Sequence, residues 1–326
     1  MSFYKDKRVL ITGGLGFIGS HLAEKLVKLG AKVTIVDNLS KGSLKNIESI
    51  RDKVELITGD LMDYSVCKGC TRNKDIVFHL AAPVGGRGYI EEHPGECSRA
   101  FAINENVFRA CLVNNVERVH FASSACVYPY SLQNEYGSTY LLKEEDADLT
   151  NPRECDTLYG WAKLTGELQL KAYYEEYGLK SSIARYVTVY GPRENDTHAI
   201  IALLLRAIRK EDPYIVWGSG RQDRDFTYIS DIVDGSLLIT EKVTNAEAYN
   251  LGTGIKYTIN EVVEKIFEIV KWRPRKIKYL LDKPEGVKSR GLDITKARSL
   301  GWYPKVSLEK GIRLTYEYLI MEEKKC

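Results

Sequence analysis

The sequence lacks an apolar run approaching the roughly 18 residues that a membrane-spanning helix needs, and residues 1–7 lack the apolar core of a secretory signal. It also has little net charge: 47 basic and 44 acidic side chains leave +3, spread along the chain. That surplus is too small to indicate a nucleic-acid partner. We therefore expect a cytoplasmic globular protein that binds neither membranes nor nucleic acid.

Cysteine does not form the even, regular set of a secreted disulfide scaffold, because the seven cysteines are scattered along the chain. Cys67 and Cys70 have the spacing of a zinc knuckle. No second close pair of cysteine or histidine residues follows to complete a tetrahedral site. We therefore expect free thiols and no metal.

Short runs rich in valine, isoleucine and leucine alternate with helical patterns through the first half of the chain. This alternation predicts an α/β fold, a Rossmann-type doubly wound parallel sheet whose strands are buried on both faces. The predicted strands are 8–12, 32–37, 54–58, 76–80, 119–123 and 181–187, and the predicted helices are 18–29, 101–114, 157–177 and 199–210.

The chain also shows a change of rhythm after Tyr190, where Gly191-Pro192-Arg193 interrupts the pattern. We expect residues 1–190 to form a dinucleotide-binding Rossmann domain, with 226–253 returning to it. Residues 191–225 and 254–326 are expected to form a smaller C-terminal substrate-binding domain.

A glycine-rich turn follows the first predicted strand, running from Gly13 through Gly16 to Gly19 and into a helical pattern. Glycine suits such a turn because a pyrophosphate must approach bare backbone and the helix must pack close to its strand. The helix N-terminus then faces the phosphate charge with free N–H groups. The sequence therefore predicts a dinucleotide site.

The second predicted strand ends at Asp37, eighteen residues after Gly19, close to the spacing of a carboxylate that binds the adenosine ribose. A carboxylate there repels a 2′-phosphate, which favours NAD over NADP. The alternative is that Asp37 only closes a turn with Asn38. Asp60, at the end of Thr58-Gly59-Asp60, is either an adenine contact or a turn residue.

Tyr159 and Lys163 stand four residues apart in a predicted helix, which places the phenol and the ammonium on one face. A free tyrosine has a pKa of about 10 and is a poor base at neutral pH. We expect the Lys163 ammonium, together with an oxidised nicotinamide, to lower that pKa. Without the dinucleotide turn upstream, such a pair would indicate only a solvated helix face.

Ser124 follows a predicted strand at the sheet edge where ligands of open α/β proteins bind. Its hydroxyl is placed to share the reacting oxygen of a substrate with Tyr159. Cys126 comes two residues later and would point to the same side if the chain stayed extended. From periodicity alone, its thiol is a packing group.

Taken together, the motifs resemble the extended short-chain dehydrogenase/reductases that modify nucleotide sugars, and the resemblance runs nearly end to end. The further segments that carry it are His79-Leu80-Ala81-Ala82, Tyr190-Gly191-Pro192, Arg224-Asp225-Phe226 and Asn250-Leu251-Gly252. The resemblance implies cofactor contacts from Gly13, Gly16, Phe17, Ile18, Gly19, Asp37, Asn38, Asp60, Leu61, Ala81, Ala82, Tyr159 and Lys163.

Within that superfamily the sequence most resembles the GDP-mannose 3,5-epimerases and then the GDP-fucose synthases. Four segments carry this: 85–90, 123–129, the helix start at His198, and 284–290. The resemblance implies that Cys126 and His198 are an acid/base pair, which joins Ser124, Tyr159 and Lys163 as catalytic residues. It implies substrate contacts from Gly86, Arg87, Ser124, Thr188, Arg224 and Arg290.

Thr188 departs from the pattern, because the family commonly has asparagine there, and 94–104 matches poorly. The resemblance further implies a homodimer that pairs through the helices near 101–114 and 157–177.

The activity expected is NAD-dependent epimerisation of a GDP-sugar through a transient 4-keto intermediate, at C3, C5 or both. A 4,6-dehydratase would carry an acidic pair where this chain has Ala125-Cys126, and a fucose-synthase-type reductase would use NADPH, which Asp37 disfavours. A UDP-sugar 4-epimerase and a nucleotide-sugar C4 dehydrogenase remain open, since both need only Ser124, Tyr159 and Lys163. A catalytically inactive NAD-binding regulator is a further alternative.

Overall fold

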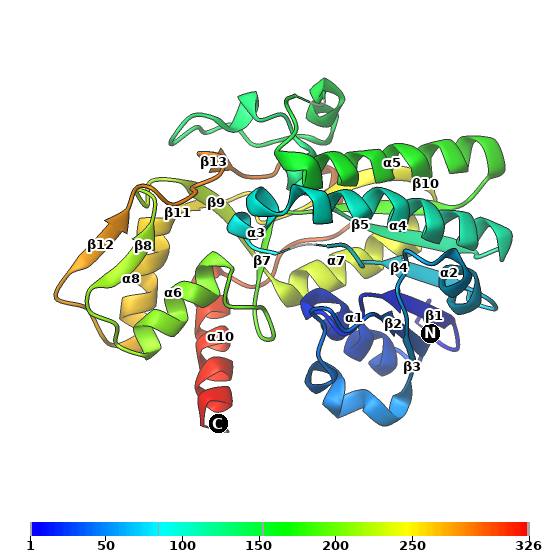
Figure 1. The fold of residues 1–326 in the computed structure, drawn as a ribbon, viewed down its shortest axis with the longest axis horizontal. Helices are drawn as coiled ribbons and strands as arrows, with labels where there is room; N and C mark the ends of the chain where they lie inside the picture. Colours follow the sequence, from blue (N-terminus) through cyan, green and yellow to red (C-terminus); the bar gives the residue numbers. More distant parts are fainter. Residues whose placement is uncertain (1, 84, 152, 325–326) are drawn as a thin grey trace.

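The computed structural model describes residues 2–83, 85–151 and 153–324. Its largest sheet has seven parallel strands in the order β10-β6-β5-β4-β1-β2-β3 (Figure 1). These strands are β1 (Arg8–Thr12), β2 (Lys32–Asp37), β3 (Val54–Thr58), β4 (Ile76–His79), β5 (Arg118–Ser124), β6 (Ser181–Tyr186) and β10 (Asn245–Leu251).

Helices cover both faces of this sheet, so alternate side chains of one strand enter different cores. In β1, Val9 and Ile11 belong to one buried cluster and Leu10 to the other. Figure 1 shows two groups of helices on opposite sides of the strands. One group is α2 (Tyr64–Cys70), α3 (Arg87–Glu92), α4 (Pro94–Val113) and α5 (Thr157–Tyr177), and the other is α1 (Phe17–Lys28) and α7 (Ile229–Lys242).

The strand order reverses direction between β1 and β4, which pair in parallel with Thr12 opposite His79. In open α/β sheets a crevice forms beyond the carboxyl ends of the strands at such a point. His79 is fully buried there and is held by the Thr12 hydroxyl at 2.8 Å and the Asn104 side chain at 3.1 Å. Strand order therefore places the crevice next to the glycine turn.

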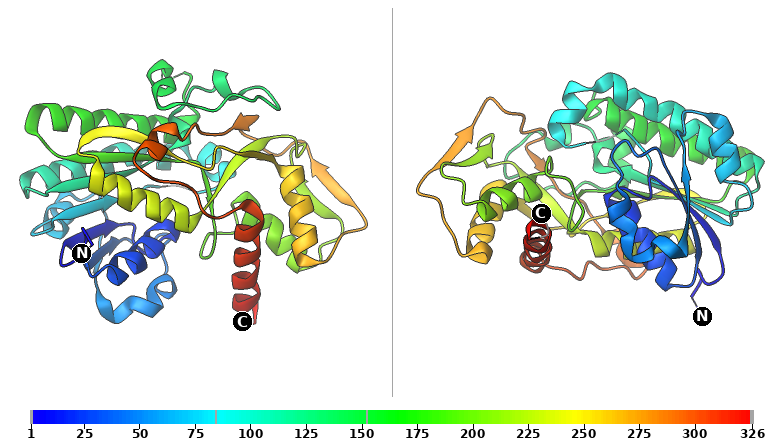
Figure 2. Two further views of the ribbon diagram at one scale, coloured as in Figure 1. Left: turned by 180° about the vertical axis from the view of Figure 1, so that it is seen from behind. Right: turned by 60° about the horizontal axis from the view of Figure 1, so that its bottom comes forward.

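The C-terminal part of the chain builds two smaller sheets beside the large one (Figure 2). Helix α8 (Ile259–Val270) in this part starts at a capping box formed by Thr258 and Glu261, and its Val262, Val263 and Ile266 side chains are buried. The remaining elements are β7 (Thr188–Tyr190), α6 (Ala199–Ile208), β8 (Tyr214–Trp217), β9 (Asp223–Tyr228), β11 (Lys256–Thr258), α8 (Ile259–Val270), β12 (Ile277–Leu280), β13 (Ser289–Arg290), α9 (Thr295–Ser299) and α10 (Leu308–Glu323), with 3₁₀ turns η1 (Leu44–Lys53), η2 (Ala125–Val127), η3 (Ser131–Gln133) and η4 (Glu144–Leu149).

The predicted fold class is confirmed, and each of the six predicted strands is present with ends differing by at most a residue. The predicted start of the helix at 101 is wrong. Helix α4 begins at Pro94, because proline is suited to a first helical turn and Glu96 favours that positive end. Among the described residues, no helix is long and apolar enough to cross a membrane.

The segment 226–253 is divided between the sheets. Strand β9 pairs with β7, β11 and β13 in a smaller sheet, whereas β10 pairs with β6 in the large one. The division into two domains itself stays a prediction.

Candidate active site

The glycine turn between β1 and α1 leaves backbone uncovered at the crevice. Gly13 has φ +68, and a Cβ there would lie 3.0 Å from the Cα of Ala81, which follows β4. A Cβ on Gly19 would lie 2.4 Å from the Gly13 carbonyl oxygen, so only glycine lets α1 pack this close to its strand. Helix α1 starts at Phe17 and Ile18, and its N-cap residue Gly16 supplies no side-chain cap. These residues fit a dinucleotide pyrophosphate.

Asp37 ends β2 and is 8% exposed. Its carboxylate accepts hydrogen bonds from the backbone N–H of Leu15 at 3.1 Å and of Leu39 at 2.9 Å. The turn expected as the alternative is therefore present, but it is made with Leu15 and Leu39. The neighbouring Asn38 is exposed and accepts from the Ser40 N–H at 3.1 Å. The ribose contact of Asp37 stays a prediction.

Asp60 lies in the loop after β3, where it makes a turn contact and an ion pair, and its adenine contact stays a prediction. It accepts from the Met62 N–H at 2.9 Å, and it forms an ion pair with Arg99 at 3.2 Å. Leu61 beside it is buried. Ala81 and Ala82 are half-buried at the end of β4, and the Ala81 N–H donates to the Thr12 hydroxyl at 3.1 Å.

The side chains of Tyr159 and Lys163 come together on α5 as the spacing predicts. The Lys163 ammonium lies 5.7 Å from the centre of the Tyr159 ring and donates to the Ala122 carbonyl at 2.6 Å. Burial lowers the pKa of Lys163 to about 8. Burial also raises the pKa of the Tyr159 phenol, while a hydrogen bond with Ser124 acts in the opposite direction. The expected lowering depends on Lys163 together with an oxidised nicotinamide, so it stays a prediction for the NAD-bound enzyme.

Cys126 lies in η2, so the chain does not stay extended after Ser124, and the condition for Cys126 to point to the same side is not met. The Ser124 hydroxyl accepts from the Cys126 N–H at 3.1 Å and caps this turn. Helix α5 packs tightly on the turn, because a Cβ on Gly160 would lie 2.1 Å from the Cys126 carbonyl oxygen. Because Tyr159 precedes Gly160 in α5, this contact also holds Cys126 next to Tyr159.

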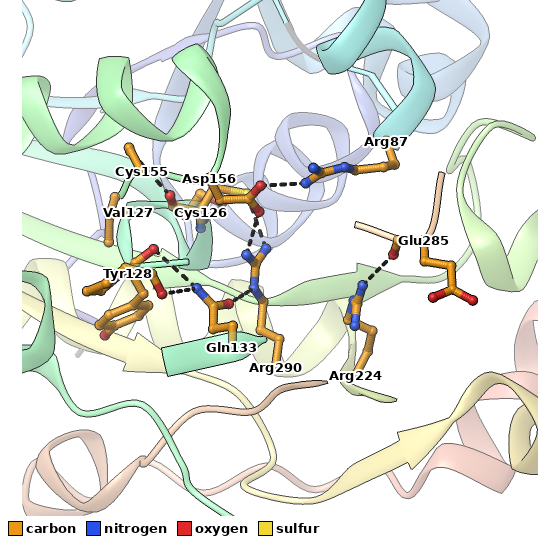
Figure 3. A network of polar contacts seen from close by, with 12 residues as sticks. Arg87, Cys126, Val127, Tyr128, Gln133, Cys155, Asp156, Arg224, Glu285 and Arg290 are labelled. Atoms are coloured by element: carbon orange, nitrogen blue, oxygen red, sulfur yellow. Dashed lines mark hydrogen bonds and ion pairs between the residues drawn. The ribbon is translucent and has the colours of Figure 1, made fainter. Parts of the chain in front are cut away.

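The Cys126 thiol also contacts a guanidinium, since Arg290 Nη1 lies 3.3 Å from its sulfur (Figure 3). Arg290 Nε donates to Gln133 at 2.5 Å and Nη2 to Asp156 at 2.5 Å. Every nitrogen of this side chain is therefore engaged. A positive charge fixed against a thiol stabilises its thiolate form.

Asp156 joins two of the arginines expected to bind substrate, because Arg87 Nη1 also donates to it at 2.5 Å (Figure 3). The two guanidiniums overcome burial and lower the pKa of Asp156 to about 2. Arg224 lies beside this group, donating to the carbonyls of Asp223 and Glu285. Burial and the other arginines lower the pKa of Arg224 to about 10. Arg87 also pairs with Glu91 at 2.5 Å, so the three guanidiniums exceed the carboxylates of Asp156 and Glu91 by one positive charge, which suits a diphosphate.

His198 is the N-cap residue of α6. Its Nδ1 lies 2.7 Å from a carboxylate oxygen of Glu194, whose side chain is only 2% exposed. The Gly86 N–H donates to the Thr197 hydroxyl at 3.3 Å, so the loop after β4 lies against this helix start. Thr188 is half-buried in β7 opposite Phe226 of β9.

Sequence reasoning missed three residues of the site: Gln133, Asp156 and Glu194. None carries a motif or a spacing that separates it from other polar residues. The structure brings Ser124, Cys126, Tyr159, Lys163 and Arg290 together, whereas Asn38 and Asp60 lie in the loops after β2 and β3.

Comparison with known proteins shows which enzymes this chain is similar to. A UDP-N-acetyl-alpha-D-glucosaminuronate decarboxylase of Bacillus cytotoxicus is 33% identical over 96% of this chain and 97% of its own. GDP-mannose 3,5-epimerase 1 of Oryza sativa subsp. indica is 33% identical over 96% of this chain and 81% of its own. The crystal structure of UDP-glucose 4-epimerase from Thermotoga maritima with UDP-glucose matches with a TM-score of 0.85 and 31% identity, over 97% of this chain and 99% of that one.

The model of the NAD-dependent epimerase/dehydratase family matches residues 9–252. That span includes the glycine turn, Asp37, Ser124 and the Tyr159/Lys163 pair. The expectations of an enzyme and of NAD as its cofactor are thereby confirmed. The chain belongs to the NAD-dependent epimerase/dehydratase family.

Proposed function

We propose that this protein is a nucleotide-sugar epimerase that forms a transient 4-keto intermediate and inverts C3, C5 or both on a GDP-sugar. NAD, when bound, supplies the hydride acceptor and donor at C4. Tyr159 takes the proton of the C4 hydroxyl while Ser124 shares that oxygen. Because burial raises the pKa of Tyr159, the phenol needs positive charge nearby, and Lys163 provides part of it.

The ketone at C4 acidifies the hydrogens at C3 and C5. Cys126 and His198, acting from opposite sides of the ring, remove and return a proton at these carbons. Each oxidation at C4 is reversed on the same sugar, so no external reductant is consumed.

The observation that carries the proposal is the contact of 3.3 Å between Arg290 and the Cys126 thiol. A reaction confined to C4 needs Ser124, Tyr159 and Lys163 but no ionisable thiol beside them. Proton abstraction from carbon requires a basic group, and a thiol held against a guanidinium is suited to that role. The rice relative, a GDP-mannose 3,5-epimerase by name, supports a GDP-sugar.

A UDP-sugar 4-epimerase or C4 dehydrogenase is the second candidate. It is favoured by the likeness to the Thermotoga maritima 4-epimerase and by the sufficiency of Ser124, Tyr159 and Lys163 for C4 chemistry. The Bacillus cytotoxicus relative adds nucleotide-sugar uronate decarboxylation to the reactions that need testing.

The test is to incubate the NAD-loaded enzyme with GDP- and UDP-sugars, uronates included, in heavy water and to locate deuterium by NMR. Enolisation imports deuterium at C3 or C5, whereas 4-epimerisation recycles its own hydrogen. We expect Cys126→Ser to slow exchange strongly while hydride transfer at C4 persists. Epimerised product without deuterium would remove Cys126 and His198 from the mechanism.

Cys155→Ser is the matched control. The Cys155 thiol is half-buried and donates to the Cys126 carbonyl at 3.7 Å, a bond that serine can also make. Exchange in Cys155→Ser should match that of the unmodified enzyme. Tyr159→Phe should abolish every reaction of the panel, and unchanged activity in that variant would favour an inactive NAD-binding regulator.

We also infer a homodimer that pairs through α4 and α5. Apolar side chains are exposed on both helices, with Val113 49%, Leu168 56% and Tyr177 55% exposed. Analytical ultracentrifugation should show a dimer, and Leu168→Glu should shift it towards monomer. A monomeric unmodified protein would overturn this inference.

A further inference from the structure

Glu194 is a buried acidic residue that the proposed chemistry does not use. It lies in the segment between β7 and α6, and its side chain is 2% exposed. Among the described residues, the basic side chain within salt-bridge distance of Glu194 is that of His198, whose Nδ1 lies 2.7 Å from a carboxylate oxygen. An ionised carboxylate is rarely buried without such a partner.

Most of the groups around His198 disfavour a protonated ring. The exceptions are Glu194 and the Gly85 carbonyl. His198 is the N-cap residue of α6, where the positive end of a ten-residue helix opposes a second positive charge. The Lys41 ammonium, from the loop after β2, acts in the same direction, as does burial. The Gly85 carbonyl, from the loop after β4, favours the protonated ring.

We propose that Glu194 is a positioning residue whose buried carboxylate, 2.7 Å from Nδ1, holds the His198 imidazole protonated, so that His198 enters the reaction as the proton donor. This proposal rests on the proposed function for the part that His198 plays. The carboxylate supplies a negative charge that offsets the positive helix end and Lys41. In agreement, the pKa of His198 is raised, with Glu194 as the main cause acting against burial.

The arrangement complements the other half of the acid/base pair. Arg290 lies 3.3 Å from the Cys126 sulfur, and Glu194 lies 2.7 Å from Nδ1 of His198. In the proposed reaction, Cys126 removes a proton from carbon and His198 returns one. Loss of Glu194 should therefore affect the protonation state of His198 before it affects the binding of a nucleotide sugar.

The experiment follows the His198 ring by NMR during a pH titration of the NAD-loaded enzyme. The sequence has five histidines, and His198→Gln identifies the signal of interest. In Glu194→Gln we expect the pKa of His198 to fall by at least one unit, which is about a tenfold loss of protonated ring above the titration midpoint. Glu194→Asp, which keeps the charge, should restore part of the shift. Glu309→Gln in α10, whose carboxylate is 62% exposed and pairs with Arg313, is the matched control and should leave the titration unchanged.

The proposal is overturned if His198 titrates at the same pH in Glu194→Gln and in the unmodified enzyme. If Glu194→Gln does not fold, the pKa of His198 is measured in the unmodified enzyme alone. A value at or below the ordinary one of about 6.5 would also overturn the proposal. The titration needs no turnover, so it separates this proposal from the proposed function. If the pKa shift is found but no deuterium enters any sugar, the proposed function fails and the pairing of Glu194 with His198 stands.

In an active enzyme, the alkaline limb of the pH profile for deuterium exchange should also move to lower pH in Glu194→Gln. The sign follows from the role of His198, because a proton donor must be protonated to act. An unmoved alkaline limb would contradict the role of Glu194 in the reaction.

Discussion

Gly160 offers a direct test of how the site is assembled, because its position in α5 leaves no space for a methyl group. The Cβ of an alanine there would lie 2.1 Å from the Cys126 carbonyl oxygen and 2.8 Å from its carbonyl carbon, both backbone atoms. A backbone contact cannot be relieved by a rotamer change. Ordinary contact requires the start of α5 and the turn η2 to separate by about 1 Å.

That separation displaces the neighbouring Tyr159 and the Cys126 thiol relative to each other. A misplacement of about 1 Å can cost roughly 100-fold in rate, so we expect the kcat of Gly160→Ala to fall by about that factor. The stability change should be small. Overpacking costs about 1–3 kcal/mol, whereas replacing glycine with alanine in a helix returns about 1 kcal/mol.

The assay measures turnover of the nucleotide sugar at saturating NAD, together with the free energy of unfolding. Gly95→Ala is the matched control, because Gly95 is also in the first turn of a helix, α4, and no other atom lies within 4 Å of its Cβ position. This control should keep full activity and gain up to about 1 kcal/mol. Full kcat in Gly160→Ala would refute the reasoning that this contact sets the site geometry.

Three further outcomes are expected. Arg290→Met should slow alkylation of Cys126 at neutral pH about tenfold, read by mass spectrometry of the modified peptide, because the variant removes the guanidinium that lies 3.3 Å from the sulfur and a nearby cation makes a thiol more reactive; an unchanged rate would contradict it. Asp37→Asn should narrow the preference for NAD over NADP about tenfold in binding titrations, because the carboxylate no longer repels a 2′-phosphate; an unaltered ratio would argue against a ribose site. Burial lowers the pKa of His79 and His120 to about 3 each. Between pH 6.5 and 5, these two histidines therefore take up protons only in the unfolded chain, where the histidine pKa is about 6.5, and the free energy of unfolding should fall by about 3 kcal/mol. In denaturant titrations, His120→Asn should halve that loss, and a loss equal to that of the unmodified protein would refute the argument that buried neutral histidines cause it.

The sequence by itself determined those features that depend on neighbours along the chain. The glycine turn was predictable because a tight strand-to-helix connection needs residues without a Cβ. A Cβ added at Gly19 would lie only 2.4 Å from the Gly13 carbonyl oxygen. The pairing of Tyr159 with Lys163 follows from helical periodicity alone. Strand positions follow from apolar runs that are buried on both faces.

Only the tertiary structure decided the electrostatic surroundings of the reacting groups. Asp156 meets Arg87 across 69 residues and Arg290 across 134, separations for which no sequence periodicity exists. Likewise, burial raises the pKa of Tyr159, and the turn at Ala125–Val127 ends the extended course of the chain before Cys126. Local spacing determines which side chains share an element, whereas desolvation and long-range ion pairs depend on which elements pack together, and the packing arises only when the whole chain folds.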